Sequence, residues 1–178
     1  MKKLTEFSVL FTVSSAVVLC LMTGPMASAQ TSTNKLRIGV YDSRAVAAAY
    51  VNSTEYQEML KTKHADYEKA KAAKDEKRMK EIDSRMNLQQ RWVHEQVFST
   101  GSVRDIVANI KGALPEVAKK AGVQTIVSKW ELNYQAPDVE LVDVTVDLGV
   151  LFHASDDKQK WKGILRGPPP LPMDEAGD

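Results

Sequence analysis

Between Ser53 and Phe98 the chain reads STEYQEMLKTKHADYEKAKAAKDEKRMKEIDSRMNLQQRWVHEQVF, and this stretch contains neither glycine nor proline. More than half of it is Ala, Lys, Glu, Gln, Met or Arg, which favour helix. Its apolar residues recur at heptad spacing, which gives a narrow seam that buries one stripe against one neighbour. We therefore expect an antiparallel helical hairpin that turns between residues 73 and 85, with an intermolecular coil as the alternative. The seam residues are Tyr56, Leu60, Tyr67, Ala70, Met79, Ile82, Met86, Val93 and Val97.

The residues before this stretch predict a strand followed by a short helix. Apolar residues alternate over 36–40, as they do in a half-buried strand. Asp42 and Ser43 follow, and both residue types are common helix caps. The short helix is expected over 45–51, and Ser53 is expected to cap the long helical stretch.

A second helical pattern follows the long stretch. Residues 99–102 contain glycine and interrupt the pattern, and apolar residues then return on one helical face over 103–121. Gly122 is a natural C-cap for this helix. Pro115 lacks the amide hydrogen that a helix interior needs, so we expect the helix to bend or restart there.

The last third of the chain predicts a small β unit and a tail. Residues 123–128 are β-branched and short, and Leu132 and Tyr134 alternate after them, which predicts two adjacent strands, most simply a hairpin. Residues 139–152 fit both a strand and one face of a helix, so periodicity leaves both open. Residues 156–178 are polar and proline-rich, which predicts a mostly disordered tail. The alternative for its proline run is a ligand for a groove-type domain.

Charge is nearly balanced in total but unevenly distributed. The 178 residues include 24 Lys and Arg against 23 Asp and Glu, a net charge of +1, which argues against nucleic acid as a partner. Residues 61–91 hold ten basic and six acidic residues, whereas 131–157 hold seven acidic residues and no Lys or Arg. The basic region could attract acidic partners over a distance. The alternative is that it only keeps a thin hairpin solvated.

The first residues predict export from the cytoplasm. A basic start is followed by a short apolar run and by the small residues Ala27-Ser28-Ala29, the pattern of a cleavable signal peptide. We expect cleavage between Ala29 and Gln30. Cys20, the single cysteine, would leave with the signal, so the mature chain would form no disulfide.

The order of these segments, over about 35–152, resembles the Skp/OmpH family of periplasmic chaperones. Residues 38–42 resemble its first strand, 117–122 resemble the end of a helix before the strand at 125–127, and Asp143-Val144-Thr145 resembles the opening of its last helix. The resemblance implies an α+β fold: a small β body of three to four strands, completed by trimerisation, and a protruding antiparallel α-helical hairpin arm. The implied divisions are a signal peptide (1–29), a linker (30–35), a family-like domain (36–155) with its body (36–52 and 116–155) and helical arm (53–115), and the disordered tail (156–178).

The resemblance also implies a function: a periplasmic holdase that binds unfolded outer-membrane or exported proteins between the arms of a homotrimer, without ATP. It implies no enzyme activity, no cofactor and no stable insertion into a membrane, and leaves open a contact with the envelope surface. The residues expected to bind such clients are flexible, aromatic or basic ones on the arm: Tyr56, Tyr67, Lys71, Lys74, Lys77, Arg78, Met79, Met86 and Trp92. Those expected to build the oligomeric body are Ile38, Val40, Ile126, Val127, Leu132 and Tyr134.

Other chemistry has less support from the sequence. The alternative function is a structural or adaptor coiled-coil protein of the cell envelope. Asp42, Asp143 and Asp147 lack an accompanying nucleophile or phosphate-binding loop, so we expect caps or surface charges rather than a catalytic site. His64 and His94 would face each other only if the hairpin turned near residue 79. We therefore expect no metal site and no catalytic residues.

Overall fold

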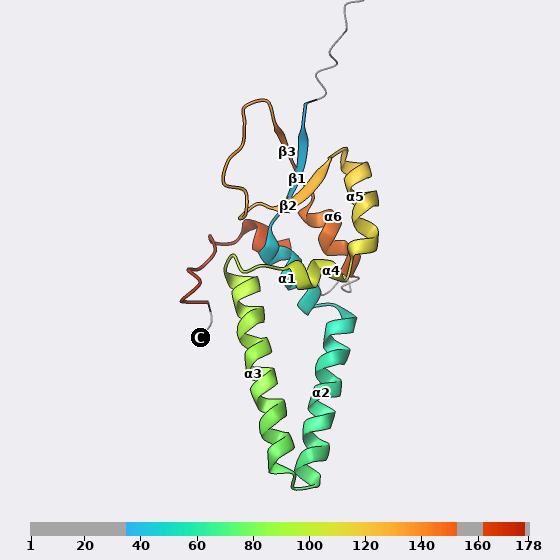
Figure 1. Cartoon of the computed structure of the whole chain (residues 1–178), viewed down its shortest axis with the longest axis vertical. Helices are drawn as coiled ribbons and strands as arrows, with labels where there is room; N and C mark the ends of the chain where they lie inside the picture. Colours follow the sequence, from blue (N-terminus) through green and yellow to red (C-terminus); the bar gives the residue numbers. More distant parts are fainter. Residues whose placement is uncertain (1–34, 153–161, 177–178) are drawn as a thin grey trace, which may run out of the picture. The chain divides into compact units, whose positions relative to one another are not determined.

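The computed structural model describes residues 35–152 and 162–176 (Figure 1). The expected signal peptide and most of the linker lie outside these residues. The described chain combines helices with one small sheet, as the α+β prediction requires. The elements in chain order are β1 (Arg37–Tyr41), α1 (Ser43–Val51), α2 (Thr54–Ala72), α3 (Glu76–Phe98), α4 (Arg104–Ala108), the 3₁₀ turn η1 (Lys111–Ala113), α5 (Leu114–Ala121), β2 (Thr125–Ser128), β3 (Glu140–Asp143), α6 (Thr145–Gly149) and the 3₁₀ turn η2 (Val150–Phe152).

The sheet has three strands in the order β2-β1-β3, and β1 runs parallel to both neighbours. Val40 lies opposite Val127 of β2 and opposite Asp143 of β3. Gly39 of β1 lies close beside β2, and a Cβ atom added to it would come within 3.2 Å of the carbonyl oxygen of Thr125. All three strands therefore end at the same edge of the sheet, beside the start of α1.

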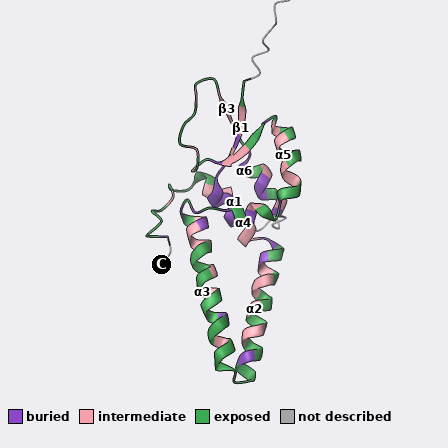
Figure 2. Ribbon diagram, in the orientation of Figure 1, coloured by how far each residue is buried: buried purple, intermediate pink, exposed green. Residues whose placement is uncertain are grey.

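Helix α1 is the centre of the hydrophobic core. Asp42 caps it as predicted, because its carboxylate accepts a hydrogen bond from the amide of Arg44. Val46 of α1 is fully buried, and so is Leu148 of α6; Ile106 of α4 is 2% exposed. Figure 2 shows the buried residues concentrated in α1 and α6. The body is thus held together by helices from both ends of the sequence that close around α1.

Helices α2 and α3 lie side by side and follow the predicted long helical stretch (Figure 1). Ser53 caps α2 as predicted, through a hydrogen bond from the amide of Tyr56 to its hydroxyl oxygen. The chain turns at residues 73–75, inside the expected interval, and Lys74 there has a positive φ of 56°. Ala70 and Ile82, both on the predicted seam, are 6% exposed next to this turn.

The next helical region confirms the expected break. The pattern over 103–121 divides into α4, η1 and α5, and Pro115 stands in the first turn of α5, where its missing amide hydrogen costs nothing. Gly122 ends α5 in the left-handed conformation, with a φ of 64°. Both features depend on the residue type at a single position, so they could be predicted from the sequence.

The predicted strand hairpin after residue 123 is wrong. Residues 125–128 form a strand, but its neighbour is β1, in parallel, and Leu132 and Tyr134 lie in the loop between β2 and β3. Tyr134 is 78% exposed. Two alternating apolar residues are too weak a signal for a strand, and the parallel partner of β2 lies more than eighty residues earlier in the chain.

The ambiguous residues 139–152 form both candidate structures in turn. They begin as strand β3 and continue as helix α6. The change occurs at Asp143, whose carboxylate accepts a hydrogen bond from the amide of Thr145 at 2.8 Å. The Asp-x-Thr segment thus marks the boundary between strand and helix.

The tail predicted to be mostly disordered has described positions for residues 162–176. Its contacts with the body include a hydrogen bond from the amide of Leu171 to the carbonyl of Phe98, at 2.8 Å. The guanidinium of Arg44 donates to the carbonyl of Pro168. This part of the tail therefore lies against α1 and the end of α3.

Candidate functional site

A groove of about 400 Å³ lies between α2 and α3, next to α1. It is formed where the first turns of α2 face the second half of α3. Six of its eleven lining residues are apolar or aromatic, and the other five are polar or charged. The residues that line it are Tyr50, Tyr56, Met59, Lys63, Arg85, Leu88, Gln89, Trp92, Val93, Gln96 and Asp105.

The floor of the groove is a pair of tyrosines. The rings of Tyr50 and Tyr56 meet edge to face, with centroids 5.1 Å apart, and Tyr50 also contacts the ring of Phe152 at 5.6 Å. Burial raises the pKa of both tyrosines, and for Tyr56 a hydrogen bond from Gln89 offsets part of the rise. The phenols are therefore neutral at physiological pH and give the groove a fixed, uncharged aromatic floor.

The rim of the groove on α3 exposes two large apolar side chains. Trp92 is 55% exposed and Leu88 is 41% exposed, and they are four residues apart, so they lie on the same helical face. Lys63 of α2 donates a hydrogen bond to Gln89 across the groove, and Arg85 lies one turn before Leu88. The rim thus combines exposed apolar area with positive charge.

The arrangement suits an extended apolar chain better than a small rigid ligand. Met59 offers a flexible, polarisable surface, and an exposed tryptophan offers a large area for contact. Surfaces of this kind adapt to many partners, because the same side chains can repack around different shapes.

The residues predicted to bind clients fall into three separate groups. Tyr56 and Trp92 line the groove, Tyr56 as a buried floor residue and Trp92 as an exposed rim residue. The half-buried seam residues Tyr67, Met79 and Met86 lie along the helices between the groove and the turn. The four basic residues, Lys71, Lys74, Lys77 and Arg78, are exposed at the α2–α3 turn.

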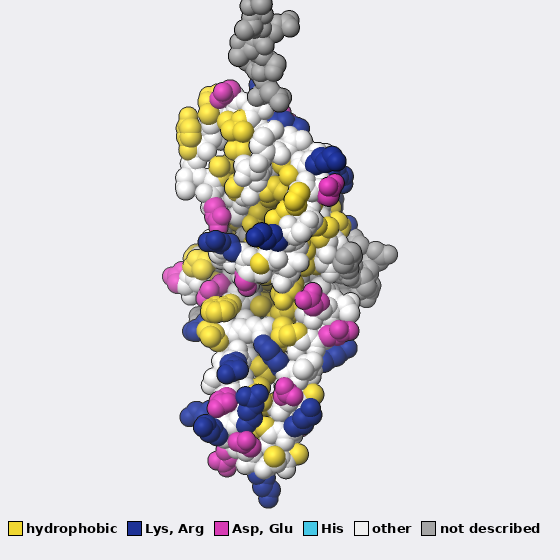
Figure 3. All heavy atoms as spheres, turned by 45° about the vertical axis from the view of Figure 1, so that its right-hand side comes forward, with side chains coloured by type: hydrophobic (Ala, Val, Ile, Leu, Met, Phe, Trp, Pro, Cys, Tyr) yellow, Lys and Arg dark blue, Asp and Glu magenta, His cyan; other side chains and the backbone are white. Residues whose placement is uncertain are grey.

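The basic turn is an electrostatic feature of its own. Figure 3 shows Lys and Arg side chains over the lower part of the molecule, where α2 and α3 lie, with acidic side chains among them. Arg78 pairs with Glu81 at 3.3 Å, and Lys77, Lys80 and Arg85 line a shallow hollow on α3. The positive charge at this turn is therefore only partly neutralised locally.

Sequence reasoning missed several residues of the groove. Leu88 and Met59 lie off the heptad seam, and Tyr50 belongs to the short helix α1 rather than to the long helices. A signal was present in the sequence, because Leu88 and Trp92 form an apolar pair at helical spacing outside the seam. Such a second apolar stripe on an otherwise charged helix indicates a face that contacts something other than α2.

Four of the residues predicted to form the oligomeric body lie in the sheet. Ile38 and Val40 belong to β1, and Ile126 and Val127 belong to β2. All four are partly buried within a single chain. Leu132 and Tyr134 lie outside the strands, in the loop described above, so the prediction that they extend the sheet is wrong.

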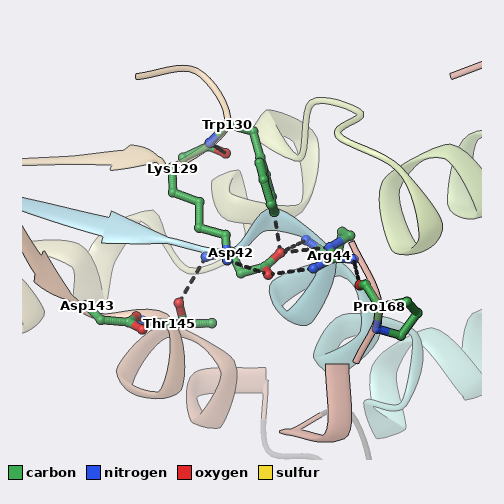
Figure 4. Close-up of polar contacts among 8 residues, drawn as sticks. Asp42, Arg44, Lys129, Trp130, Asp143, Thr145 and Pro168 are labelled. Carbon is green, nitrogen blue, oxygen red and sulfur yellow. Dashed lines mark hydrogen bonds and ion pairs between the residues drawn. The ribbon is translucent and has the colours of Figure 1, made fainter. Parts of the chain in front are cut away.

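A second polar centre lies where the strands end, at the buried carboxylate of Asp42 (Figure 4). This side chain is 1% exposed and accepts hydrogen bonds from Arg44, from Trp130 at 3.2 Å and from Lys129 at 2.8 Å. Burial alone would raise the pKa of Asp42, but these hydrogen bonds and the nearby Lys129 hold it below its ordinary value. The amide of Asp42 donates to the hydroxyl of Thr145 at 2.9 Å.

Each of the three aspartates that the sequence drew attention to has its own partners in the body. Asp42 accepts from three side chains, Asp143 accepts from the amide of Thr145 at the start of α6, and Asp147 pairs with Lys120 at 2.7 Å. Each of the three therefore has a structural role in stabilising the body. The cluster around Asp42 ties together the ends of β1 and β2 and the start of α1.

Two further sequence predictions concern a metal site and insertion into a membrane. The ring of His94 meets the ring of Phe98 edge to face, with centroids 5.6 Å apart. Lys63, the residue before His64, hydrogen-bonds to Gln89, so His64 is not opposite His94. Within residues 35–152 and 162–176, no three His, Cys, Asp or Glu side chains gather closely enough to hold a metal ion. Among the helices described, none is both long enough and apolar enough to cross a membrane.

No protein-family model matches this chain, and neither does any curated protein or solved structure with which it was compared.

Proposed function

We propose that this chain is an ATP-independent holdase of the periplasm, which binds apolar segments of unfolded outer-membrane or exported proteins. The observation that carries the proposal is the exposed pair of Leu88 and Trp92 above the aromatic groove between α2 and α3. Exposed apolar area beside a groove is a common place for contacts with partners, and tryptophan is enriched among the residues that contribute most to such contacts. The pair therefore serves as the contact surface for clients.

The charge distribution supports the same function. The four basic residues at the α2–α3 turn attract acidic chains over several ångströms, since exposed charges act within a Debye length of about 8 Å at physiological salt. Lys63 and Arg85 continue the positive charge to the rim of the groove. A client is thus drawn by charge and held by apolar contacts, which needs no nucleotide.

In this proposal α2 and α3 form an antiparallel arm, and three chains assemble through their β bodies. Each described edge strand, β2 or β3, pairs only with β1 in the chain, so a second copy could pair with either edge. A three-stranded sheet of four- and five-residue strands is small for an isolated domain, and an oligomer would bury more of it. The mass of the mature protein in solution tests this part: a trimer supports it, and a monomer contradicts it.

The holdase proposal is tested by aggregation of an unfolded outer-membrane protein, diluted from urea into buffer without nucleotide. Light scattering should fall as the mature wild-type chain is added. The double variant Leu88→Ala, Trp92→Ala removes the exposed pair, and we expect about a tenfold higher concentration to be needed for the same effect, in line with the loss of one large aromatic contact.

Tyr134→Ala provides the matched control. It also removes a large, exposed aromatic side chain, but from the loop between β2 and β3, away from the groove. This control should suppress aggregation as well as the wild type does. Equal loss in both variants, or no suppression by the wild type at severalfold excess, contradicts the proposal. One folded partner captured by crosslinking, without any holdase effect, would instead support the adaptor alternative.

A further inference from the structure

Residues 167–172 of the tail, Gly-Pro-Pro-Pro-Leu-Pro, lie in a seat formed by α1 and the end of α3. Three hydrogen bonds hold this segment, and all three involve its backbone. Arg44 donates to the carbonyl of Pro168 at 2.9 Å. The amide of Leu171 donates to the carbonyl of Phe98 at 2.8 Å, and the hydroxyl of Ser99 donates to the carbonyl of Leu171 at 2.6 Å.

The contacts match the repeat of a polyproline helix. Proline fixes its own φ and excludes the α-helical region for the residue before it, so residues 167–171 favour the polyproline II conformation. That helix has three residues per turn, which places positions 168 and 171 on the same side. Both are the positions that the seat contacts. Within 168–172 only Leu171 has an amide hydrogen, and this is the one donated to Phe98.

Arg44, which donates to Pro168, is held in place by the fold independently of the tail. The Arg44 side chain is 8% exposed, and Asp42 fixes it through hydrogen bonds to Nε and Nη2 (Figure 4). Its guanidinium also lies 5.3 Å from the centre of the Trp130 ring. Ser99 is 1% exposed at the end of α3. The seat is therefore preorganised to bind a chain in this conformation.

The tail does not fill the seat. A hollow of about 280 Å³ remains between the tail and α3, and Arg44 of α1 and Val97 and Phe98 of α3 line the side opposite the tail. Phe98 is still 50% exposed and Leu171 is 46% exposed. A segment with a larger side chain near position 169 would bury more apolar surface here than the chain's own segment does.

We propose that Arg44, Phe98 and Ser99 form a binding site for a proline-rich segment of another polypeptide, in which a proline is followed three residues later by an apolar residue with a free amide. The chain's own residues 167–172 occupy the site until such a segment replaces them. If two copies of the chain exchanged this segment, each segment would form the same three hydrogen bonds as before, so the exchange would add no binding free energy. A foreign segment gains the contacts of the unfilled hollow, and this favours it over a second copy.

The test uses the full mature chain and a labelled synthetic peptide with the sequence of residues 163–172. Leu171→Pro in the chain removes the one amide that the tail donates, and it preserves the polyproline conformation. This variant loses one of the tail's three hydrogen bonds to the seat and puts the proline ring where the amide met the Phe98 carbonyl, so it weakens the tail's hold on the seat. Fluorescence anisotropy should then show the peptide binding at least tenfold more tightly to it than to the wild type. Phenylalanine in place of Pro169 in the peptide should tighten binding further, and Ser99→Ala added to the Leu171→Pro chain should weaken it about tenfold, because the peptide then loses the Ser99 hydrogen bond without competition from a fully bound tail.

A second measurement needs no variant. Hydrogen exchange of the Leu171 amide in the wild-type chain should be slow, because this amide is bonded to Phe98. Excess phenylalanine-containing peptide should accelerate it severalfold as the tail is displaced. Equal peptide affinity for wild type and Leu171→Pro, no effect of Ser99→Ala, or unchanged exchange under excess peptide overturns the proposal. A lower mass of the Leu171→Pro chain in solution also overturns it, because the seat would then hold the tail of a second copy.

Discussion

The substitution Asp42→Asn tests the polar cluster at the end of the sheet. Asparagine keeps the size of the side chain and one oxygen acceptor, but it removes the negative charge. Its amide group would then face the ammonium of Lys129 or the guanidinium of Arg44, both of which can only donate. The fold would be left with a buried guanidinium that lacks its counter-charge.

The size of the effect follows from the burial of the partners. Asp42 is 1% and Arg44 is 8% exposed, and removal of one partner from a buried pair costs about 3–5 kcal/mol. Lys129 is 40% exposed, so its share is at most about 1 kcal/mol. Because asparagine retains an acceptor for Trp130 and for the Arg44 amide, we expect the lower end, about 3 kcal/mol. With a urea m-value of about 2 kcal/mol/M, the midpoint should fall by about 1.5 M.

The pH dependence of the free energy of unfolding gives this prediction a second, independent test. The pKa of Asp42 is lowered in the folded chain, so its contribution is complete above the ordinary aspartate pKa of about 3.9. The contribution is lost as the pH falls through the lowered, folded-state pKa. The difference between wild type and Asp42→Asn should therefore be full at pH 7 and shrink below about pH 4.

Urea unfolding at fixed protein concentration, followed by circular dichroism, measures both effects. Asp138→Asn provides the control, since it neutralises an exposed aspartate in the loop between β2 and β3. It should change the free energy of unfolding by less than about 0.5 kcal/mol. A loss below about 1 kcal/mol for Asp42→Asn at pH 7, or an equal loss at pH 7 and at pH 3, would refute the assigned role of the cluster.

Two further predictions concern residues with positive φ. Gly122→Ala should lower the free energy of unfolding by about 1–2 kcal/mol, because φ is 64° and the new Cβ would lie 2.5 Å from the Arg37 guanidinium; an unchanged urea midpoint would contradict the assigned C-cap. Lys74→Gly should raise the melting temperature slightly. Glycine removes the cost of the left-handed conformation, about 1 kcal/mol, and this gain exceeds the free energy lost because the unfolded chain becomes more flexible. A lower melting temperature would show that the turn at 73–75 is not strained at Lys74.

The helix boundaries could be predicted from the sequence because each depends on only a few neighbouring residues. Asp42 and Ser53 cap their helices through side-chain hydrogen bonds to amides two and three residues ahead. Gly122 ends α5 because it adopts a positive φ at no steric cost, and Pro115 begins α5 because a helix start needs no amide hydrogen there. None of these outcomes requires knowledge of the tertiary structure.

The strand pairing could not be predicted in the same way. The partner of β2 is β1, which lies on the far side of the long helices in the sequence, and only packing against α1 and α5 brings the two strands together. The alternation at Leu132 and Tyr134 belongs to a loop, where exposure of the tyrosine is tolerated. Residues 139–152 were ambiguous because a strand and a helix share that segment, divided at Asp143.

The candidate site was partly hidden because a heptad pattern sorts residues only by their distance from one seam. It identified Tyr56 as a seam residue, and Tyr56 is buried on the groove floor, but it did not draw attention to Leu88. Helix α3 contacts α2 on one face and α1 on another, and it exposes Leu88 and Trp92 on a third. A helix with several partners carries several overlapping apolar stripes, and the weaker ones are lost when a single stripe is sought.

The same helix carries both proposed surfaces, yet the two can be separated by experiment. The groove and the hollow beneath the proline segment share no lining residue. The two surfaces come close at the end of α3, where Gln96 lines the groove and Val97 lines the hollow, and past the seat, where Met173 and Trp92 line a further hollow. A peptide that ends at Pro172 does not include Met173. In the Leu171→Pro chain, Ser99→Ala should therefore weaken peptide binding and leave suppression of aggregation unchanged, whereas Leu88→Ala with Trp92→Ala should do the reverse. Joint loss in either variant would mean that α3 acts as one continuous binding surface.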